Sequence, residues 1–71
     1  MGDQKEEAMR RLKRKGYSPV GSDKYGVYLQ NDRTRVYVDH VGIFIYRRFY
    51  SKGPWFRESG HCFPSIPWEY L

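Results

Sequence analysis

The sequence has little of what marks many classes of protein. Its 71 residues include one cysteine, Cys62, so no internal disulfide can form and a reducing compartment is expected. The longest apolar run, Val41 to Tyr46, is too short to span a bilayer, and residues 1–15 are too highly charged for a signal peptide. These absences predict a cytoplasmic protein that has no membrane partner.

Patterns of metal ligands and nucleophiles are missing as well. His61 and Cys62 are adjacent and His40 is distant, which leaves no two ligand pairs at the spacing of a zinc site. The glycines form no phosphate-binding motif, and no two carboxylates stand out as a general acid and base. A chain this short buries only about 60% of the surface that its unfolded form exposes, so it has no room for a cleft between domains. We therefore expect a single domain over residues 1–71 that is not an enzyme, with no catalytic residue, metal or cofactor.

Residues 3–15 carry the signals of a helix. Asp3 and Glu6 fit a capping box at its start. At its end, Gly16 occupies the position that favours a left-handed backbone, and Tyr17 can then pack back on Leu12 in a Schellman motif. The apolar stripe of this helix is narrow and consists of Ala8, Met9 and Leu12. We expect the helix to dock on a sheet with this stripe and to leave its other faces in water.

Residues 25–50 follow a period of two, which predicts three strands of an antiparallel meander. Asn31-Asp32 and the segment from Asp39 to Gly42 supply the tight turns. One predicted face is aliphatic: Val27, Leu29, Val36, Val38, Ile43 and Ile45. The other is aromatic and basic: Tyr28, Arg35, Tyr37, Phe44, Tyr46, Arg48 and Tyr50. The aliphatic face is the expected seat of the helix, because a helix on one side of an antiparallel sheet makes a stable two-layer fold.

Residues 51–71 are broken by prolines and glycines but contain too many aromatic residues for a disordered tail. The predicted fold is therefore α+β: an N-terminal helix packed on a three-stranded antiparallel meander, with an irregular C-terminal segment, rich in proline and aromatic residues, wrapped over the sheet. Two arrangements fit this pattern. Either the segment closes the aromatic face as a second minor core, or part of that face stays open for a partner.

The first half of the chain resembles known folds. The opening helix, Lys15-Gly16-Tyr17 and the strands at Val27 and Val36 resemble the helix-then-meander layout of the HicA-type messenger-RNA-cleaving toxins and of double-stranded-RNA-binding domains. The resemblance covers residues 5–40 and implies a topology. Near the start of the first strand, where such a toxin places its catalytic histidine, this chain has Lys24-Tyr25, and a proline-broken segment replaces the closing helix of those folds. The resemblance therefore does not extend to the toxins' activity.

Charge and aromatic residues together indicate a class of partner. The chain has 13 Lys and Arg against 8 Asp and Glu, a net charge of +5, and basic residues gather in the last turns of the predicted helix. Aromatic rings can stack on bases, and guanidinium groups can bind phosphate. We therefore predict a small basic nucleic-acid-binding protein, accessory or regulatory, whose partner is DNA or RNA. The predicted contact residues are Arg10, Arg11, Arg14, Lys15, Arg35, Tyr37, Tyr46, Arg48, Lys52 and Trp55.

A second hypothesis is a protein partner. Tyr and Arg are also enriched at protein–protein hot spots. In this alternative the chain is an inhibitor or adaptor module, of the size encoded by phages and mobile elements, and contacts its partner through the aromatic stretch from Phe44 to Phe56. The expected state is a monomer or a weak homodimer that buries the aromatic face.

Overall fold

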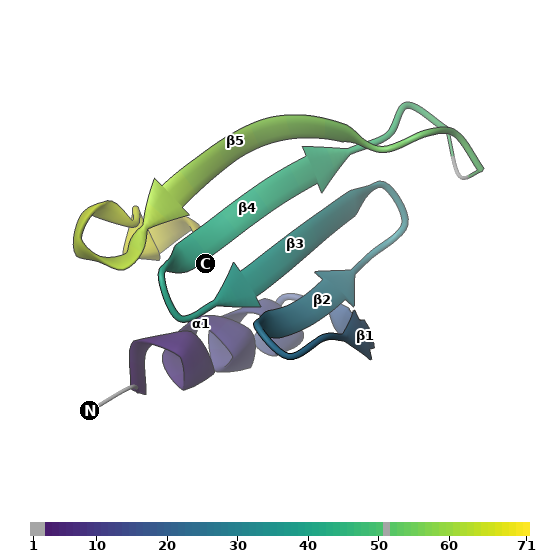
Figure 1. Ribbon diagram of the computed structural model, residues 1–71. Helices are drawn as coiled ribbons and strands as arrows, with labels where there is room; N and C mark the ends of the chain where they lie inside the picture. Colours follow the sequence, from purple (N-terminus) through teal and green to yellow (C-terminus); the bar gives the residue numbers. More distant parts are fainter. Residues whose placement is uncertain (1–2, 51) are drawn as a thin grey trace.

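One helix and a five-stranded antiparallel sheet form the two layers of the fold (Figure 1). The computed structural model describes residues 3–50 and 52–71. The elements are α1 (Asp3–Arg14), β1 (Ser18–Ser22), β2 (Gly26–Gln30), β3 (Thr34–Asp39), β4 (Gly42–Arg47), β5 (Phe56–Cys62) and two 3-10 turns, η1 (Phe63–Ser65) and η2 (Trp68–Tyr70). The order of the strands in the sheet is their order in the chain, so the sheet is a meander.

The predicted helix and its C-terminal motif are confirmed. The Tyr17 amide donates to the Leu12 carbonyl at 3.0 Å, and the Gly16 amide donates to the Lys13 carbonyl at 3.0 Å. This is the hydrogen-bond pair of a Schellman motif, and Gly16 has the positive φ of 98° that the motif requires. The expected capping box involves the side chain of Asp3, which lies outside the described residues.

Three turns of the sheet are built in the same way. Asp23, Asn31 and Asp39 each accept, through one side-chain oxygen, the backbone amides two and three residues further along the chain. This local bond replaces a backbone partner in the turn, which is why Asp and Asn are favoured there. The turns predicted at Asn31-Asp32 and from Asp39 to Gly42 are confirmed, and the Asp23 turn joins β1 to β2.

The prediction of a three-stranded meander over residues 25–50 is wrong, because a further strand pairs on each side of it. β1 consists of exposed residues, among which Pro19 and Gly21 are depleted in strands, and it is held by its antiparallel pairing with β2. β5 pairs antiparallel with β4 although Gly60 lies in its interior. The fourth strand in the chain, β4, ends at Arg47 and not at Tyr50, because its partner β3 begins at Thr34, opposite Arg47.

The prediction that residues 51–71 form an irregular wrap is also wrong. Their first part forms β5, which widens the sheet. Their last part joins α1 on the aliphatic side, where Phe63 and Ile66 are buried with Ala8 and Leu12 (Figure 1). The helix packs against β1, β2 and β3, which leaves the aliphatic side of β4 for the C-terminal residues to cover.

The core lies on the predicted aliphatic face. Its buried residues are Ala8, Leu12, Leu29, Val36, Val38, Ile43, Phe63 and Ile66. Met9, Tyr17, Val27, Ile45, Trp68 and Leu71 pack against them and are partly buried. In the described part of the chain, no helix is long and apolar enough to cross a membrane.

Candidate functional site

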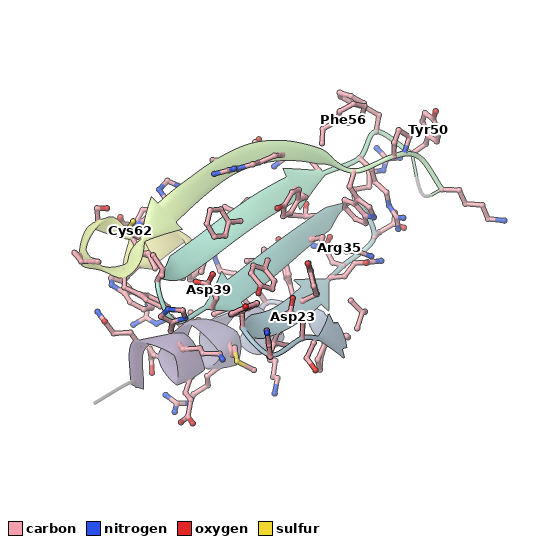
Figure 2. All side chains as sticks on the ribbon, viewed as in Figure 1. Asp23, Arg35, Asp39, Tyr50, Phe56 and Cys62 are labelled. Carbon is pink, nitrogen blue, oxygen red and sulfur yellow. The ribbon has the colours of Figure 1, made fainter. Side chains whose placement is uncertain are left out.

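The aromatic face of the sheet is uncovered by any helix or strand of the described chain, and we call it the open face. Its residues alternate along β2, β3 and β4 with those of the core, and its rings project toward the viewer in Figure 2. Tyr28, Tyr37, Phe44 and Tyr46 are all half-buried. A surface of four rings that no other layer covers offers flat apolar area to a partner.

Tyr37 is held flat against the sheet. A Cβ atom placed on Gly26 of the neighbouring strand would clash with the backbone oxygen of Val38 and lie 3.0 Å from Cζ of Tyr37, so the close approach of the β3 backbone and of this ring requires glycine. The Tyr37 hydroxyl donates to Oδ1 of Asp23 at 3.0 Å. Burial, followed by this hydrogen bond, raises the pKa of Tyr37 to about 12, while the amides of Tyr25 and Gly26 lower the pKa of Asp23. The hydroxyl end of the ring is thus held in place, and the ring is half-buried.

A row of rings crosses the sheet at this level. Tyr28, Tyr37 and Phe44 lie directly opposite one another on β2, β3 and β4, with ring centroids 4.6 Å and 6.3 Å apart. The next partner in the row is Gly60 of β5, where a Cβ atom would lie 2.9 Å from Cδ1 of Phe44. The guanidinium of Arg57 lies 4.8 Å from the centre of the Phe44 ring.

Arg35 is fixed beside this row. Its Nε and Nη2 atoms both donate to Oε1 of Gln30, at 2.9 Å and 2.6 Å, across the β2–β3 pair. Its guanidinium also lies over two rings, 5.7 Å from the centre of Tyr28 and 4.7 Å from that of Trp55. Two hydrogen bonds and two cation–π contacts therefore set the plane of this group before any partner arrives.

Arg48, which directly follows β4, is fixed in a similar way. Its Nε and Nη2 atoms donate to the backbone oxygen of Asp32, at 3.0 Å and 2.9 Å. Its guanidinium lies 4.3 Å from the centre of the Trp55 ring. Trp55, which was predicted as a stacking surface for bases, therefore contacts the guanidinium groups of both Arg35 and Arg48.

The open face has a basic end and an acidic end along the direction of the strands. A hollow of about 250 Å³ lies at its basic end, lined by Tyr28, Arg35, Tyr46 and Trp55. Arg57 stands opposite Tyr46 at the same end. Asp39 lies at the other end of β3 from Arg35, as Figure 2 shows. An anionic partner would therefore be held at the end of the face that carries the hollow.

The helix cations predicted as contacts are partly neutralised. Arg10 and Arg11 both pair with Glu7, and Arg11 Nε lies 2.8 Å from the Glu7 carboxylate. The hydrogen bond from Arg11 holds the pKa of Glu7 below its ordinary value. Arg11 also donates to the Trp68 carbonyl at 3.0 Å and lies over the Trp68 ring, so it fastens the C-terminal turn to α1.

The structure divides the predicted contact residues into two sets. Arg35, Tyr37, Tyr46, Arg48 and Trp55 come together on the open face. The helix set consists of Arg10, Arg11, Arg14 and Lys15, on the layer that covers the opposite face (Figure 1). Lys52 is exposed in the loop that joins β4 to β5. The helix end and the open face therefore do not form one continuous surface.

Several residues of the open face were missed in the sequence. Gln30 was read only as part of the alternating strand, and Arg57 was missed because β5 was not recognised. Gly26 and Gly60 are the places where Tyr37 and Phe44 cross a neighbouring strand. A glycine inside an alternating strand was the available signal, since it often marks a close approach by another group.

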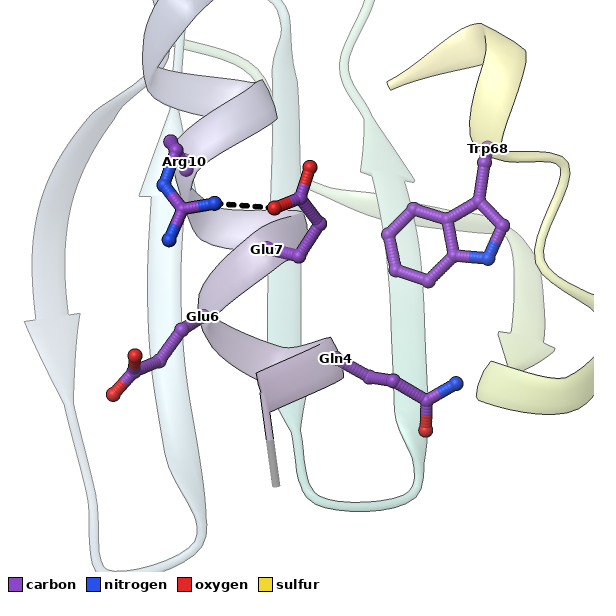
Figure 3. Close-up of a pocket in the computed structure, with 5 residues that line it drawn as sticks. All are labelled: Gln4, Glu6, Glu7, Arg10 and Trp68. Carbon is purple, nitrogen blue, oxygen red and sulfur yellow. Dashed lines mark hydrogen bonds and ion pairs between the residues drawn. The ribbon is translucent and has the colours of Figure 1, made fainter. Parts of the chain in front are cut away.

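A depression beside the helix differs in character from the open face. It has a volume of about 340 Å³ and is lined by Gln4, Glu6, Glu7, Arg10 and Trp68 (Figure 3). Its one guanidinium is paired with Glu7, as the dashed line in Figure 3 marks. Two carboxylates and a paired arginine give no net attraction for a phosphate.

A third surface lies where β4 leads to β5. Phe49, Tyr50 and Phe56 are 73%, 63% and 52% exposed, and the rings of Phe49 and Phe56 are 5.8 Å apart. Phe56 alternates with Arg57 along β5 and so points away from the open face. This aromatic tip is a surface separate from the open face.

The sequence matches no family model, and neither a curated protein nor a solved structure gives a significant match to it. Across residues 3–50 and 52–71, no three His, Cys, Asp or Glu side chains form a group that could hold a metal ion.

Proposed function

We propose that the protein binds single-stranded nucleic acid on the basic half of its open face, in an accessory or regulatory role and not as an enzyme. The observation that carries this proposal is the pair of guanidinium groups fixed on Trp55 beside uncovered tyrosine rings. Guanidinium groups bind phosphate in a bidentate manner, and rings stack on bases, so the face holds both kinds of group that a nucleotide needs. A cytoplasmic location, which the single cysteine Cys62 favours, is part of this proposal.

The flat rings favour a single strand over a duplex. In a duplex the faces of the bases are stacked on one another and are closed to side chains, whereas unpaired bases can stack on Tyr or Phe. The ring of Tyr37 lies over Gly26 and its hydroxyl is bonded to Asp23, so it is held in place on a face that no helix or strand of the described chain covers. Tyr46 lines the hollow, and its hydroxyl takes part in no hydrogen bond with the described residues. We assign base stacking to these two rings.

Phosphate contacts are assigned to cations at the same end of the sheet. Arg48 keeps its Nη1 atom free of hydrogen bonds to the described residues, while its other nitrogens fix its orientation. Arg57 is exposed beside Phe44, and Lys52 is exposed in the adjoining loop. The helix cations are left out of the site, since they lie on the other layer of the fold.

Chemical-shift mapping of the labelled protein with a strand of about ten nucleotides tests the proposal. We expect shifts at Tyr37, Tyr46 and Arg48, and weaker binding of a duplex. Tyr46→Ala should weaken binding at least about fivefold, because stacking of one base is worth about 1–3 kcal/mol. Tyr25→Ala, the same change at a 56% exposed ring in the Asp23 turn, is the matched control and should leave binding unchanged. Shifts confined to α1, or none at low salt, would contradict the proposal.

The exposed aromatic tip favours a second candidate function, a protein partner. Phe49, Tyr50 and Phe56 are the kind of exposed rings that serve as hot spots. In this case the double substitution Phe49→Ser and Phe56→Ser should abolish a complex with a protein while leaving the chemical shifts of the open face unchanged. Loss of oligonucleotide binding in the double variant would instead assign the tip to the nucleic-acid site.

A further inference from the structure

Building on the proposed function, we propose that the hollow beside Arg35 selects guanine among the bases of the bound strand. The selecting group is the free end of the Arg35 guanidinium, and the walls of the hollow are the rings of Tyr28, Tyr46 and Trp55.

One edge of the Arg35 guanidinium is occupied and another is free. Nε and Nη2 both donate to Oε1 of Gln30, so the edge of the guanidinium between these two nitrogens is occupied. A guanidinium has five N–H groups, so its end still presents one N–H from Nη2 and two from Nη1. No hydrogen bond or ion pair among the described residues uses Nη1 of Arg35. This end offers two parallel donors to a ligand.

Two parallel donors match guanine better than the other bases. Guanine presents two acceptors, O6 and N7, on one edge, and a bidentate arginine is the commonest specific contact to it. Adenine presents an amino donor beside N7 on the same edge, so it places a donor against the donors of Arg35. Thymine or uracil offers one acceptor on that edge. An unpaired cytosine can turn its Watson–Crick edge, with the acceptors N3 and O2, toward the guanidinium, so cytosine is the base that competes with guanine. The fixed guanidinium therefore discriminates by attraction to guanine and by donor conflict with adenine.

The surroundings of Arg35 favour a base over a phosphate in the hollow. Arg35 is half-buried, and three aromatic side chains line the hollow with it. Such walls suit the apolar faces of a flat ring, whereas a phosphate keeps its affinity for water and for exposed cations. The exposed cations lie nearby on Arg57 and Lys52. Because Gln30 and two rings hold the guanidinium in place, little rotamer entropy is lost when it binds.

Strands of about ten thymidines that carry guanine, adenine, cytosine or thymine at one central position test this inference by fluorescence anisotropy. We expect the guanine strand to bind at least about fivefold more tightly than the adenine and thymine strands, and the cytosine strand to fall between them. A deaza analogue of guanine that lacks N7 should lose most of this advantage, since one of the two acceptors is gone. Equal affinity for all four strands would overturn the guanine site and leave the proposed function standing. If no strand binds, the proposed function itself fails.

Two variants separate the role of Arg35 from that of a general cation. Arg35→Lys keeps the charge but removes the paired donors, so it should abolish the preference for guanine and change affinity for the all-thymidine strand by less than about threefold. Arg48→Lys, the matched control on the same tryptophan, should weaken all four strands to the same extent. If Arg35→Lys also weakens all four strands equally, Arg35 is a phosphate contact and the inference is wrong.

Discussion

Replacing one arginine on each layer of the fold tests where the charge that binds nucleic acid lies. Arg48→Gln and Arg14→Gln remove the same charge, one at the open face and one on the exposed side of α1. If the helix end takes part in binding, both variants will reduce the salt dependence of affinity to the same extent. If binding is confined to the open face, only Arg48→Gln will respond.

The expected size of the effect follows from the number of phosphate contacts. For single strands, the slope of log affinity against log salt is about −0.7 for each phosphate that is neutralised. Three contacts, at Arg48, Lys52 and Arg57, give a slope of about −2, or about a 20-fold loss of affinity between about 50 and about 200 mM salt. Arg48→Gln should reduce the slope to about −1.4 and the loss to about sevenfold.

Fluorescence anisotropy with one labelled strand over a series of salt concentrations measures these slopes. Circular dichroism of each variant checks that the fold is kept, because Arg48 also bonds the Asp32 carbonyl. Arg14→Gln should reproduce the wild-type slope. The reasoning is refuted if Arg14→Gln lowers the slope as much as Arg48→Gln does, because the nucleic acid would then bind the helix end.

Three further predictions test the fold and the open face. Phe63→Ala should lower the free energy of unfolding by about 3–5 kcal/mol, since this ring is buried in the core. Phe49→Ala should lower it by less than about 0.5 kcal/mol, because the Phe49 ring is 73% exposed. Urea denaturation of both variants measures the difference. In an absorbance titration Tyr37 should ionise near pH 12, because its pKa is raised from 10.0. The stability that its protonated form contributes should therefore be complete below pH 10 and lost by about pH 12. Ionisation of all tyrosines near pH 10 would contradict this prediction. Gly60→Ala should destabilise the fold by about 1 kcal/mol more than Gly21→Ala does. The new Cβ at Gly60 would lie 2.9 Å from the Phe44 ring, whereas at Gly21 it would meet nothing within 4 Å. Equal thermal unfolding of the two variants would show that the Phe44 ring does not lie over β5.

Several features could be read from the sequence because local patterns specify them. The end of α1 follows from Gly16 and the residues around it, since a Schellman motif is closed within one turn. The turns at Asn31 and Asp39 follow from side chains that bond their own backbone. Alternation along three strands separated the aliphatic face from the aromatic one, and the structure keeps that division.

The strands at the two edges of the sheet could not be predicted from local sequence, because tertiary pairing holds them. β1 and β5 lack a strong strand pattern, and backbone hydrogen bonds to β2 and β4 hold them. Gly60 looked like a break in the chain, but it is the site where the Phe44 ring crosses β5. Backbone hydrogen bonds between strands do not depend on the identity of the side chains, so edge strands that are held by such bonds are hard to recognise from sequence.

The N-terminal helix, the antiparallel meander and the face of tyrosines and arginines can be read from the sequence, because these features depend on spacing within short segments. Tertiary packing places the C-terminal residues on the aliphatic side and leaves the aromatic side open, since α1 packs against β1, β2 and β3 and the aliphatic side of β4 still has apolar area to bury. It also decided that Trp55 lies against Arg35 and Arg48, which are 20 and 7 positions away in the chain. Contacts between distant segments follow from how the layers pack, and no local pattern in the sequence encodes them.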